Sequence, residues 1–388
     1  MKCKLSDICA FRKGKVDVSK LTLKTYISTE NMLPNKGGIT GASSLPAIPL
    51  TQEYKKGDVL VSNIRPYFKK IWRAKYDGGC SNDVLVFQGN SNIDRDFLYY
   101  VLANDDFFAY SMATSKGTKM PRGDKTSIMQ YEVPIFDIDT QRKIASVLRS
   151  LDEKIELNSA INNNLLQQTR VIFKHWFTDN PNLDTMKQVP LADLCLVVTK
   201  GTTPTTLGKP FVSKGINFIK AESILNNHAI DKEKFAFIDS ETNDLLKRSI
   251  ISSGDIVFTI AGTLGRFALI DDSVLPANTN QAVAIIRANQ SKVTPEYLYS
   301  FFLGNWHNDY YTKRIQQAVQ ANLSLGTIKS LPIPILSDKA MLEYLGIIKP
   351  IIAMTKANEL EITRLRAIRD ALLPQLMSGT LDVSDLDL

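Results

Sequence analysis

Two long stretches of this chain place apolar side chains at the spacing of an α-helix. The first, residues 139–179, contains no glycine and no proline. Its apolar residues recur at steps of three, four and seven, so they form one stripe along a helix. The stripe consists of Ile144, Leu148, Leu151, Ile155, Ile161, Leu165, Ile172 and Trp176. Asn158, Asn162 and Asn163 interrupt it, and asparagine at a helix seam fixes register at a cost in stability.

The second stretch, residues 338–379, repeats the pattern. Its stripe consists of Leu342, Leu345, Ile348, Ile352, Leu360, Ile362, Leu365, Ile368, Leu372 and Leu376. We expect Pro350 to start a new helix, Pro374 to kink or fray it and Gly379 to end it. A helix of about forty residues is roughly 60 Å long and overhangs a domain of about 140 residues. The two stripes are therefore predicted to face each other as an antiparallel pair; the alternative is that each helix packs only on its own domain.

Outside these helices, one order of turn, strand and helix patterns occurs twice. A Gly-Asp turn precedes a β-branched run at 58–62 and again at 255–260, which is typical of a strand after a turn. A second apolar run, a helix-like stretch and a short strand containing proline then follow. These lie at 84–87, 96–112 and 132–136 in the first copy, and at 282–286, 295–311 and 331–335 in the second.

Short sequence matches connect the two copies in the same order. The matched positions are 5–9 with 191–195, 13–14 with 200–201, 56–60 with 253–257, 81–83 with 279–281, 97–100 with 297–300, 133–135 with 331–333 and 170–172 with 366–368. The difference in residue number between matched positions grows by about ten between Gly14 and Gly57, which indicates an insertion in the second copy. Coincidence among common turn patterns is the alternative, but chance matches would scatter in order.

These patterns predict a mixed α+β (α/β) fold with a pseudo-two-fold internal repeat. Two globular domains are separated by two long helices that form an antiparallel coiled coil. The predicted boundaries are 1–138 for the first domain, 139–179 for the central helix, 187–336 for the second domain, 338–379 for the C-terminal helix and 380–388 for a tail.

Composition narrows the class of protein. The 388 residues are 44% hydrophobic and 22% charged, as in ordinary globular proteins, and the formal net charge of +7 is a mild bias towards polyanions. There is no run of eighteen apolar residues and no secretory leader, so we expect a cytoplasmic protein without a membrane span. The four cysteines and three histidines form no ligand motif, so we expect reduced thiols and no metal site.

No motif of a catalytic centre occurs in the sequence. A DNA methyltransferase needs an Asn/Asp-Pro-Pro-aromatic loop, and NPNL at 180–183 lacks the second proline and the aromatic residue. The segments at 117–126 and 201–210 have the wrong glycine–lysine spacing for a phosphate-binding loop. We therefore predict no catalytic residue and no cofactor bound by this chain.

The loops carry cationic and amide side chains instead. Arginine suits guanine edges, asparagine and glutamine suit adenine, and lysine, serine and threonine suit phosphates. The candidate DNA-binding residues are Arg65, Tyr67, Lys69, Lys70, Arg73, Lys116, Lys119, Arg122, Lys200, Thr202, Thr203, Thr263, Arg266, Asn280, Gln281, Lys313, Arg314 and Gln317. The candidates for partner docking on the helices are Arg142, Lys143, Arg149, Arg364, Arg366 and Arg369. For any single one, a solvated loop or helix face is the alternative.

The doubled order of domain and helix, together with phrases at matching places, resembles the specificity subunit of a type I restriction–modification enzyme. The phrases in the first half are KGDVLVS at 56–62, RPY at 65–67, GTKMP at 117–121, VPI at 133–135, QRKIA at 141–145 and LDEKI at 151–155. Those in the second half are GTTP at 201–204, GTLG at 262–265, NQAV at 280–283, LPIP at 331–334 and RDALLPQLMSG at 369–379. The resemblance covers nearly the whole chain.

The resemblance implies that each globular domain reads one half of a split site in double-stranded DNA. It further implies that the helices set the unread spacer and dock two methyltransferase subunits, which carry S-adenosylmethionine, and that a separate motor–nuclease subunit cleaves unmodified DNA. The segment LEYLG at 342–346 departs from the QRKIA form, so the docking surface of the second helix is expected to differ.

Two alternatives belong to other classes of protein. A scaffold that bridges two partners without reading DNA explains the helices equally well. A fused methyltransferase or nuclease is disfavoured because the chain lacks a cofactor motif.

Overall fold

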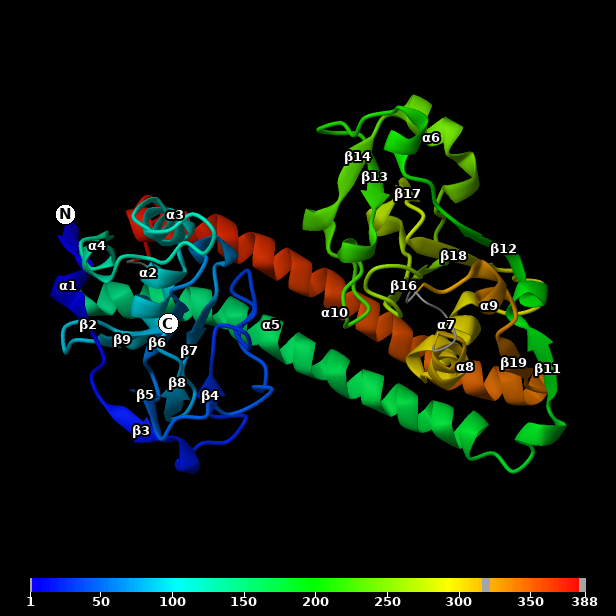
Figure 1. The fold of residues 1–388 in the computed structure, drawn as a ribbon, viewed down its shortest axis with the longest axis horizontal. Coiled ribbons are helices and arrows are strands. Elements are labelled where there is room, and N and C mark those ends of the chain that lie inside the picture. The colour runs from blue at the N-terminus through cyan, green and yellow to red at the C-terminus, as the bar shows by residue number, and fades with distance from the viewer. Residues whose placement is uncertain (1, 316–321, 384–388) are drawn as a thin grey trace. The chain divides into compact units, whose positions relative to one another are not determined.

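The structure of the chain is a computed structural model that describes residues 2–315 and 322–383, apart from the side chains of residues 309 and 313–315. The chain divides into two compact units, one formed by Met1–Leu157 with Ile362–Leu388 and the other by Asn158–Glu361. Each unit contains a globular head and one part of each of the two long helices, α5 (Ile138–Phe173) and α10 (Asp338–Ser378) (Figure 1). No helix in the described part of the chain is long and apolar enough to span a membrane.

The first head is built on an antiparallel sheet in the order β2-β9-β6-β7. Its strands are β2 (Cys9–Phe11), β9 (Val84–Gly89), β6 (Val59–Ser62) and β7 (Ile71–Arg73). All four residues of β6 are buried, because the sheet is covered on both faces. One face packs on α2 (Arg95–Ala103) and α3 (Asp105–Ala113). The other face packs on a smaller sheet.

The smaller sheet has the order β3-β5-β8-β4. Its strands are β3 (Lys15–Asp17), β5 (Leu50–Tyr54), β8 (Gly78–Cys80) and β4 (Tyr26–Ile27), of which β4 runs parallel to β8. The head is closed by β1 (Lys2–Lys4), which pairs with β10 (Glu132–Pro134) just before α5 begins. Two short helices, α1 (Leu5–Ile8) and α4 (Lys125–Ile128), complete it.

The second head repeats this order of elements. Its main sheet is β12 (Cys195–Lys200), β18 (Val283–Ala288), β15 (Ile256–Thr259) and β16 (Phe267–Leu269), in the same order as β2-β9-β6-β7. The helices α7 (Pro295–Leu303), α8 (Trp306–Ile315) and α9 (Leu325–Lys329) follow, and β11 (Lys187–Pro190) pairs with β19 (Pro332–Ile335). The shared topology confirms the mixed fold and the internal repeat.

The smaller sheets differ between the heads by more than an insertion of about ten residues. In the second head the order is β14 (Ala236–Ile238), β13 (Ile216–Ile219) and β17 (Ala277–Thr279), and the helix α6 (Ser240–Leu245) follows β14. β13 is parallel to β17, as β4 is to β8. The strand that follows β13 in the second head is β14, and it pairs with β13. The strand that follows β4 in the first head is β5, and it pairs with β8 instead of β4.

The helix-like stretches predicted at 96–112 and 295–311 are each two helices, so the prediction of one continuous helix in each head is wrong. In the first head Asn104 ends α2 and caps α3, since its side chain accepts the N–H of Asp106 at 3.3 Å. In the second head the break falls at Gly304 and Asn305, and Asn305 has a left-handed backbone with φ +60°. Local capping at asparagine and glycine therefore outweighs the helical pattern of apolar residues.

The expectation that Pro350 starts a new helix is also wrong, because α10 runs unbroken through Pro350 and Pro374. Proline at 350 removes the hydrogen bond to the carbonyl of Gly346. Both residues are exposed, so water can satisfy that carbonyl. The opposite face of the helix is held by buried Ile348 and Ile352, and this packing outweighs the local defect.

Hydrogen bonds and ion pairs between α5 and α10 confirm the antiparallel pairing. Within the first unit, Arg369 donates to Asp152 at 2.8 Å. Within the second unit, Asn158 is 2% exposed and donates to Glu361 at 2.7 Å, and Asn162 accepts from Asn358 at 2.7 Å. These partners run in opposite directions along the two helices. Asn163, in contrast, is exposed and lies off the seam, contrary to the sequence-based expectation.

Each head core is completed by a helix segment from a distant part of the sequence. In the first unit Leu373, Leu376 and Met377 of α10 belong to the same apolar cluster as Leu5 and Phe97. In the second unit the rings of Phe173, at the end of α5, and Phe177, in the π-helical segment Lys174–Thr178 that continues it, lie 5.1 and 4.7 Å from the ring of Phe301. The heads therefore depend on the helices for part of their stability.

The Gly-Asp turns are equivalent in structure as well as in sequence. Asp58 and Asp255 are buried, and each accepts the backbone N–H of the residue three positions earlier at 2.8 Å. Each also receives a guanidinium group, from Arg12 just after β2 in the first head and from Arg287 of β18 in the second. Both heads thus keep the buried aspartate of the turn. The arginine that pairs with it, however, comes from segments that do not correspond between the heads.

Replacing Leu376 by alanine should destabilise the first unit by about 2–5 kcal/mol, because the side chain is 1% exposed and leaves a cavity. Urea-induced unfolding of the full chain measures this loss. Leu360→Ala on the same helix is the matched control, because Leu360 is 60% exposed. Equal losses for the two variants would contradict the packing of α10 into this core.

Candidate DNA interface

Three loops that are distant in sequence meet on the first head. The N–H of Asn63 donates to the carbonyl of Asp83 at 2.8 Å, and that of Arg65 donates to Pro121 at 2.8 Å. Gly123 returns a hydrogen bond to the carbonyl of Asn63 at 3.1 Å. We call the loops 63–70, 81–83 and 115–123 the first loop face. It brings together the sequence-predicted residues Arg65, Tyr67, Lys69, Lys116, Lys119 and Arg122.

Acidic neighbours hold three cations of the first loop face, namely Arg122, Lys116 and Lys69. Arg122 forms an ion pair with Asp83 at 3.1 Å, and Lys116 with Asp124 at 2.6 Å. The hydrogen bond from Lys116 and those from Ser127 lower the pKa of Asp124 to about 2. Lys119 is exposed and has no acidic partner among the described residues. Its charge is therefore available to an anion such as phosphate.

The turn at 65–69 presents aromatic side chains beside these cations. Arg65 and Lys69 both have left-handed backbones, with φ of +50° and +49°. Between them Tyr67 and Phe68 are 48% and 37% exposed, and their ring centroids lie 4.7 Å apart. Backbone strain of this kind is concentrated at functional sites.

Lys36 lies in a neighbouring loop that was not among the predicted residues, and its side chain is only 10% exposed. Asn35 and Lys36 donate backbone hydrogen bonds to Phe68 and Lys69, each at 2.9 Å. Lys36 and Lys69 both contact the carboxylate of Asp105, each at 2.8 Å. The sequence NKGG at 35–38 is a turn signal that carries a cation, and it could have indicated this loop.

Lys70 and Arg73 are engaged within the head. Lys70 donates to the carbonyl of Thr29 at 2.5 Å, and burial lowers the pKa of its ammonium group. Arg73, at the end of β7, forms an ion pair with Asp96, which also contacts Arg149 of α5 at 3.0 Å. Arg73 and Arg149 thus share one carboxylate that joins α2 to the sheet and to α5.

In the second head, loop 200–204 lies against loop 279–282. The hydroxyl of Thr203 donates to the side-chain oxygen of Gln281, and the N–H of Thr202 donates to Thr279 at 3.2 Å. Gly201 permits this approach, because a Cβ there would lie 1.9 Å from the carbonyl oxygen of Thr279. We call the loops 200–204, 260–266 and 279–282 the second loop face.

Arg266 and Thr263 belong to the loop after β15, which corresponds to the loop after β6 in the first head. The hydroxyl of Thr259 donates to the carbonyl of Thr263 at 2.5 Å and accepts the N–H of Arg266 at 2.9 Å. Arg266 also donates to the carbonyl of Ile224 at 3.1 Å. Arg266 is half-buried, whereas Thr263 is exposed.

The remaining candidates of the second head are less fully described. Lys200 is exposed at the end of β12, and Asn280 is half-buried with its side-chain oxygen accepting the N–H of Ala282 at 3.2 Å. Lys313 and Arg314 lie on α8, but their side chains are outside the described part, and Gln317 lies outside the described residues. Arg248 is a cation that the sequence analysis missed, and it donates to the hydroxyl of Thr202 at 3.4 Å.

The six helix candidates occupy different environments. Arg142, Arg364 and Arg366 are exposed, and Arg142 forms an ion pair with Asp139 at 3.2 Å. Lys143 is half-buried. The side chain of Arg369 is only 11% exposed, because it contacts Asp152 and Asp370. Arg369 therefore holds α10 against α5, as Arg149 holds α5 against the first head.

The two loop faces differ in chemistry although the strands that hold them correspond. The first presents several lysines and arginines with exposed aromatic rings, whereas the second presents mainly hydroxyl and amide groups, as in the pair Thr203 and Gln281, beside the exposed Lys200 and the half-buried Arg266. Among residues 2–315 and 322–383, no cluster of three side chains is suited to hold a metal ion.

Comparison with known proteins agrees with this architecture. A family model described as "Type I restriction modification DNA specificity domain" matches residues 1–167 and 184–364. The HindI specificity subunit of Haemophilus influenzae is 25% identical, over 97% of this chain and 98% of that protein. The MjaIX specificity subunit of Methanocaldococcus jannaschii is 23% identical, over 86% of this chain and 79% of that protein.

A solved structure has the same fold. The S subunit of a type I restriction–modification system from M. genitalium superimposes with a TM-score of 0.60 at 16% identity, over 99% of this chain and 96% of that chain. Since the family model covers most of the sequence and matches once per head, the chain belongs to the type I restriction–modification specificity subunits and carries two DNA specificity domains.

Proposed function

We propose that each head reads one half of a bipartite site in double-stranded DNA through its loop face. The observation that carries this proposal is that corresponding strands support two different loop faces. A common scaffold with different loop chemistry is what reading two different half-sites requires, because base edges are distinguished by the side chains that reach them. The exposed rings of Tyr67 and Phe68 and the available charge of Lys119 support contact with DNA in the first head.

We further propose that α5 and α10 act as the spacer and as the docking site of two methyltransferase subunits. The exposed Arg142, Arg364 and Arg366 are the candidates for that contact. In this proposal the chain itself catalyses nothing and binds no cofactor. S-adenosylmethionine belongs to the methyltransferase subunits, and a motor–nuclease subunit completes the complex in the cytoplasm.

Gln281→Ala should relax the half-site read by the second head and leave the other half unchanged. One bidentate contact to a base contributes about 1–3 kcal/mol of discrimination, so methylation should spread to sites that differ at one position. The chain is co-expressed with its methyltransferase subunits, and methylated sites are mapped by sequencing. Gln188→Ala is the matched control, because Gln188 is exposed on β11, outside the second loop face. An unaltered consensus for Gln281→Ala would assign the reading to other residues.

Lys119→Ala should weaken binding to all duplexes alike and reduce the salt dependence of affinity by about one counterion. The assay is fluorescence anisotropy of a labelled duplex with the full chain and its methyltransferase subunits, at several salt concentrations. Lys2→Ala is the control, because Lys2 is exposed on β1 and pairs with Glu132. If neither variant alters binding and no bipartite consensus emerges, the chain is a scaffold that joins its partners without reading DNA.

A further inference from the structure

Arg248 is an exposed arginine beside the second loop face that the function proposed above does not use. It lies in the short 3-10 helix Lys247–Ser249, which comes before β15 in the sequence. Its guanidinium donates to the hydroxyl of Thr202, in loop 200–204, at 3.4 Å. The next residue of that loop, Thr203, donates to the side chain of Gln281. A cation and an amide group thus contact adjacent residues of one loop.

Hydrogen bonds fix the short helix to the strand that leads into loop 279–282. Asn278 is fully buried, and its side chain donates to the carbonyl of Leu246 at 3.3 Å. The N–H of Ile251 donates to the carbonyl of Ala277 at 2.9 Å. Both acceptor and donor residues at 277 and 278 belong to β17. The backbone on both sides of Arg248 is therefore held against the second loop face, as residues that position a binding group are expected to be.

The charge of Arg248 is not compensated by the loops that it faces. Loops 200–204, 260–266 and 279–282 contain no Asp and no Glu, whereas Asp83 and Asp124 form ion pairs with cations at the first loop face. Arg248 has no acidic partner among the described residues. A guanidinium group offers five donors in a planar fork, and the contact with Thr202 uses one of them. The remaining donors favour a partner that presents two acceptors side by side.

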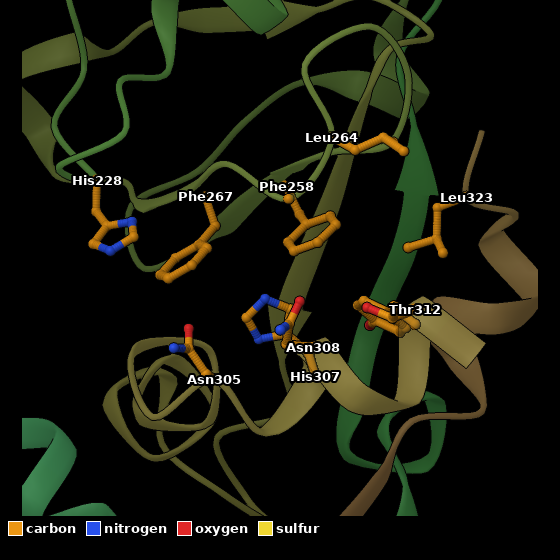
Figure 2. Close-up of a pocket in the computed structure, with 11 residues that line it drawn as sticks. His228, Phe258, Leu264, Phe267, Asn305, His307, Asn308, Thr312 and Leu323 are labelled. Carbon is orange, nitrogen blue, oxygen red and sulfur yellow. The ribbon is translucent and has the colours of Figure 1, made fainter. Parts of the chain in front are cut away.

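Arg266, the arginine that the sequence predicts for this surface, is turned into the head instead. Its Nη1 atom donates to the carbonyl of Ile224 at 3.1 Å, and its Nε atom is buried. Ring packing holds the segment that carries this acceptor, because His228 stacks on Phe267 with centroids 4.0 Å apart (Figure 2). Arg266 is half-buried and supports its loop, so its guanidinium is less accessible to DNA than that of the exposed Arg248.

The first head has no counterpart of Arg248. Gly254, in the turn before β15, matches Gly57, in the turn before β6. Arg248 lies six residues before Gly254, whereas the residue six positions before Gly57 is Thr51, which is 3% exposed within β5. A contact between Arg248 and DNA would therefore belong to the half-site of the second head alone.

We propose that Arg248 reads a guanine in the half-site of the second head, through two parallel hydrogen bonds to N7 and O6 of the base. The planar fork of arginine matches these two acceptors in the major groove. A phosphate contact tolerates a mobile cation, whereas a bidentate contact to a base needs a fixed plane. The rigid support of Arg248 and its contact with Thr202 favour the base. This inference rests on the proposed function and adds that the second half-site contains a G·C pair.

The first experiment compares methylation consensus sequences. Arg248→Ala is co-expressed with the methyltransferase subunits, and methylated sites are mapped by sequencing. One G·C position of the second half-site should lose its preference by about five- to 150-fold, while the first half-site stays unchanged. Lys247→Ala is the matched control, because it removes the same charge from the exposed neighbouring residue and keeps the contact with Thr202. This control should leave the consensus unaltered.

The second experiment removes an acceptor from the DNA instead of the donor from the protein. In the test duplex 7-deazaguanine, which lacks N7, replaces the guanine at that position. Fluorescence anisotropy measures binding of the full chain with its methyltransferase subunits. The unmodified chain should bind the test duplex at least about fivefold more weakly than the normal duplex. Arg248→Ala should bind both duplexes alike, because the contact that the modified base removes is already absent.

The outcomes separate this proposal from the proposed function. A bipartite consensus whose second half lacks a G·C pair, or keeps its G·C preference in Arg248→Ala, overturns the reading by Arg248 and leaves the proposed function standing. If Arg248→Ala instead weakens binding to all duplexes alike and lowers the salt dependence by about one counterion, Arg248 contacts a phosphate and the proposal is overturned as well. If no bipartite consensus emerges for the unmodified chain, both the proposal and the proposed function fail.

Discussion

The packing of α5 and α10 into the head cores is the constraint on which the rest of this structure depends. A head of this size buries a limited apolar core on its own. The first head gains Leu376 and its neighbours from a helix more than two hundred residues further along the chain, and the second gains Phe173 and Phe177 from a helix that precedes it. Neither unit is complete until both helices have formed, so the loop faces depend on contacts remote from them.

Local patterns predicted much of this fold. The Gly-Asp turns, the strands after them and the two stripes of apolar residues follow from turn chemistry and helical periodicity, which act over a few residues. The path of α10 through Pro350 did not follow from sequence, because the buried Ile348 and Ile352 decide it through contacts made only in the folded chain. The break at Asn104 shows the opposite case, in which one capping side chain outweighs a long apolar pattern.

The candidate site was predictable as a set of loops and less so as single residues. Arg65, Arg122 and Lys119 lie on one surface, as their turn-rich segments indicate. Arg73 and Arg369 were also predicted as contact residues because they are arginines in basic segments, yet they form ion pairs with Asp96 and Asp152 inside the first unit. The sequence does not show which acidic residue pairs with a given arginine or lysine. Only tertiary contacts distinguish an arginine in a structural ion pair from one that is available to DNA.

The strand pairs that close the heads have a mechanical consequence. Because β1 lies beside β10 and β11 beside β19, the polypeptide enters and leaves each head through adjacent strands. Changes of length inside a head are absorbed between those two strands and leave the start of the following helix where it was. The different construction of the two smaller sheets, with β14 on β13 in one head and β5 on β8 in the other, is an example. The strands and loops within each head can therefore diverge, while the strand pair that joins the head to the helices stays the same.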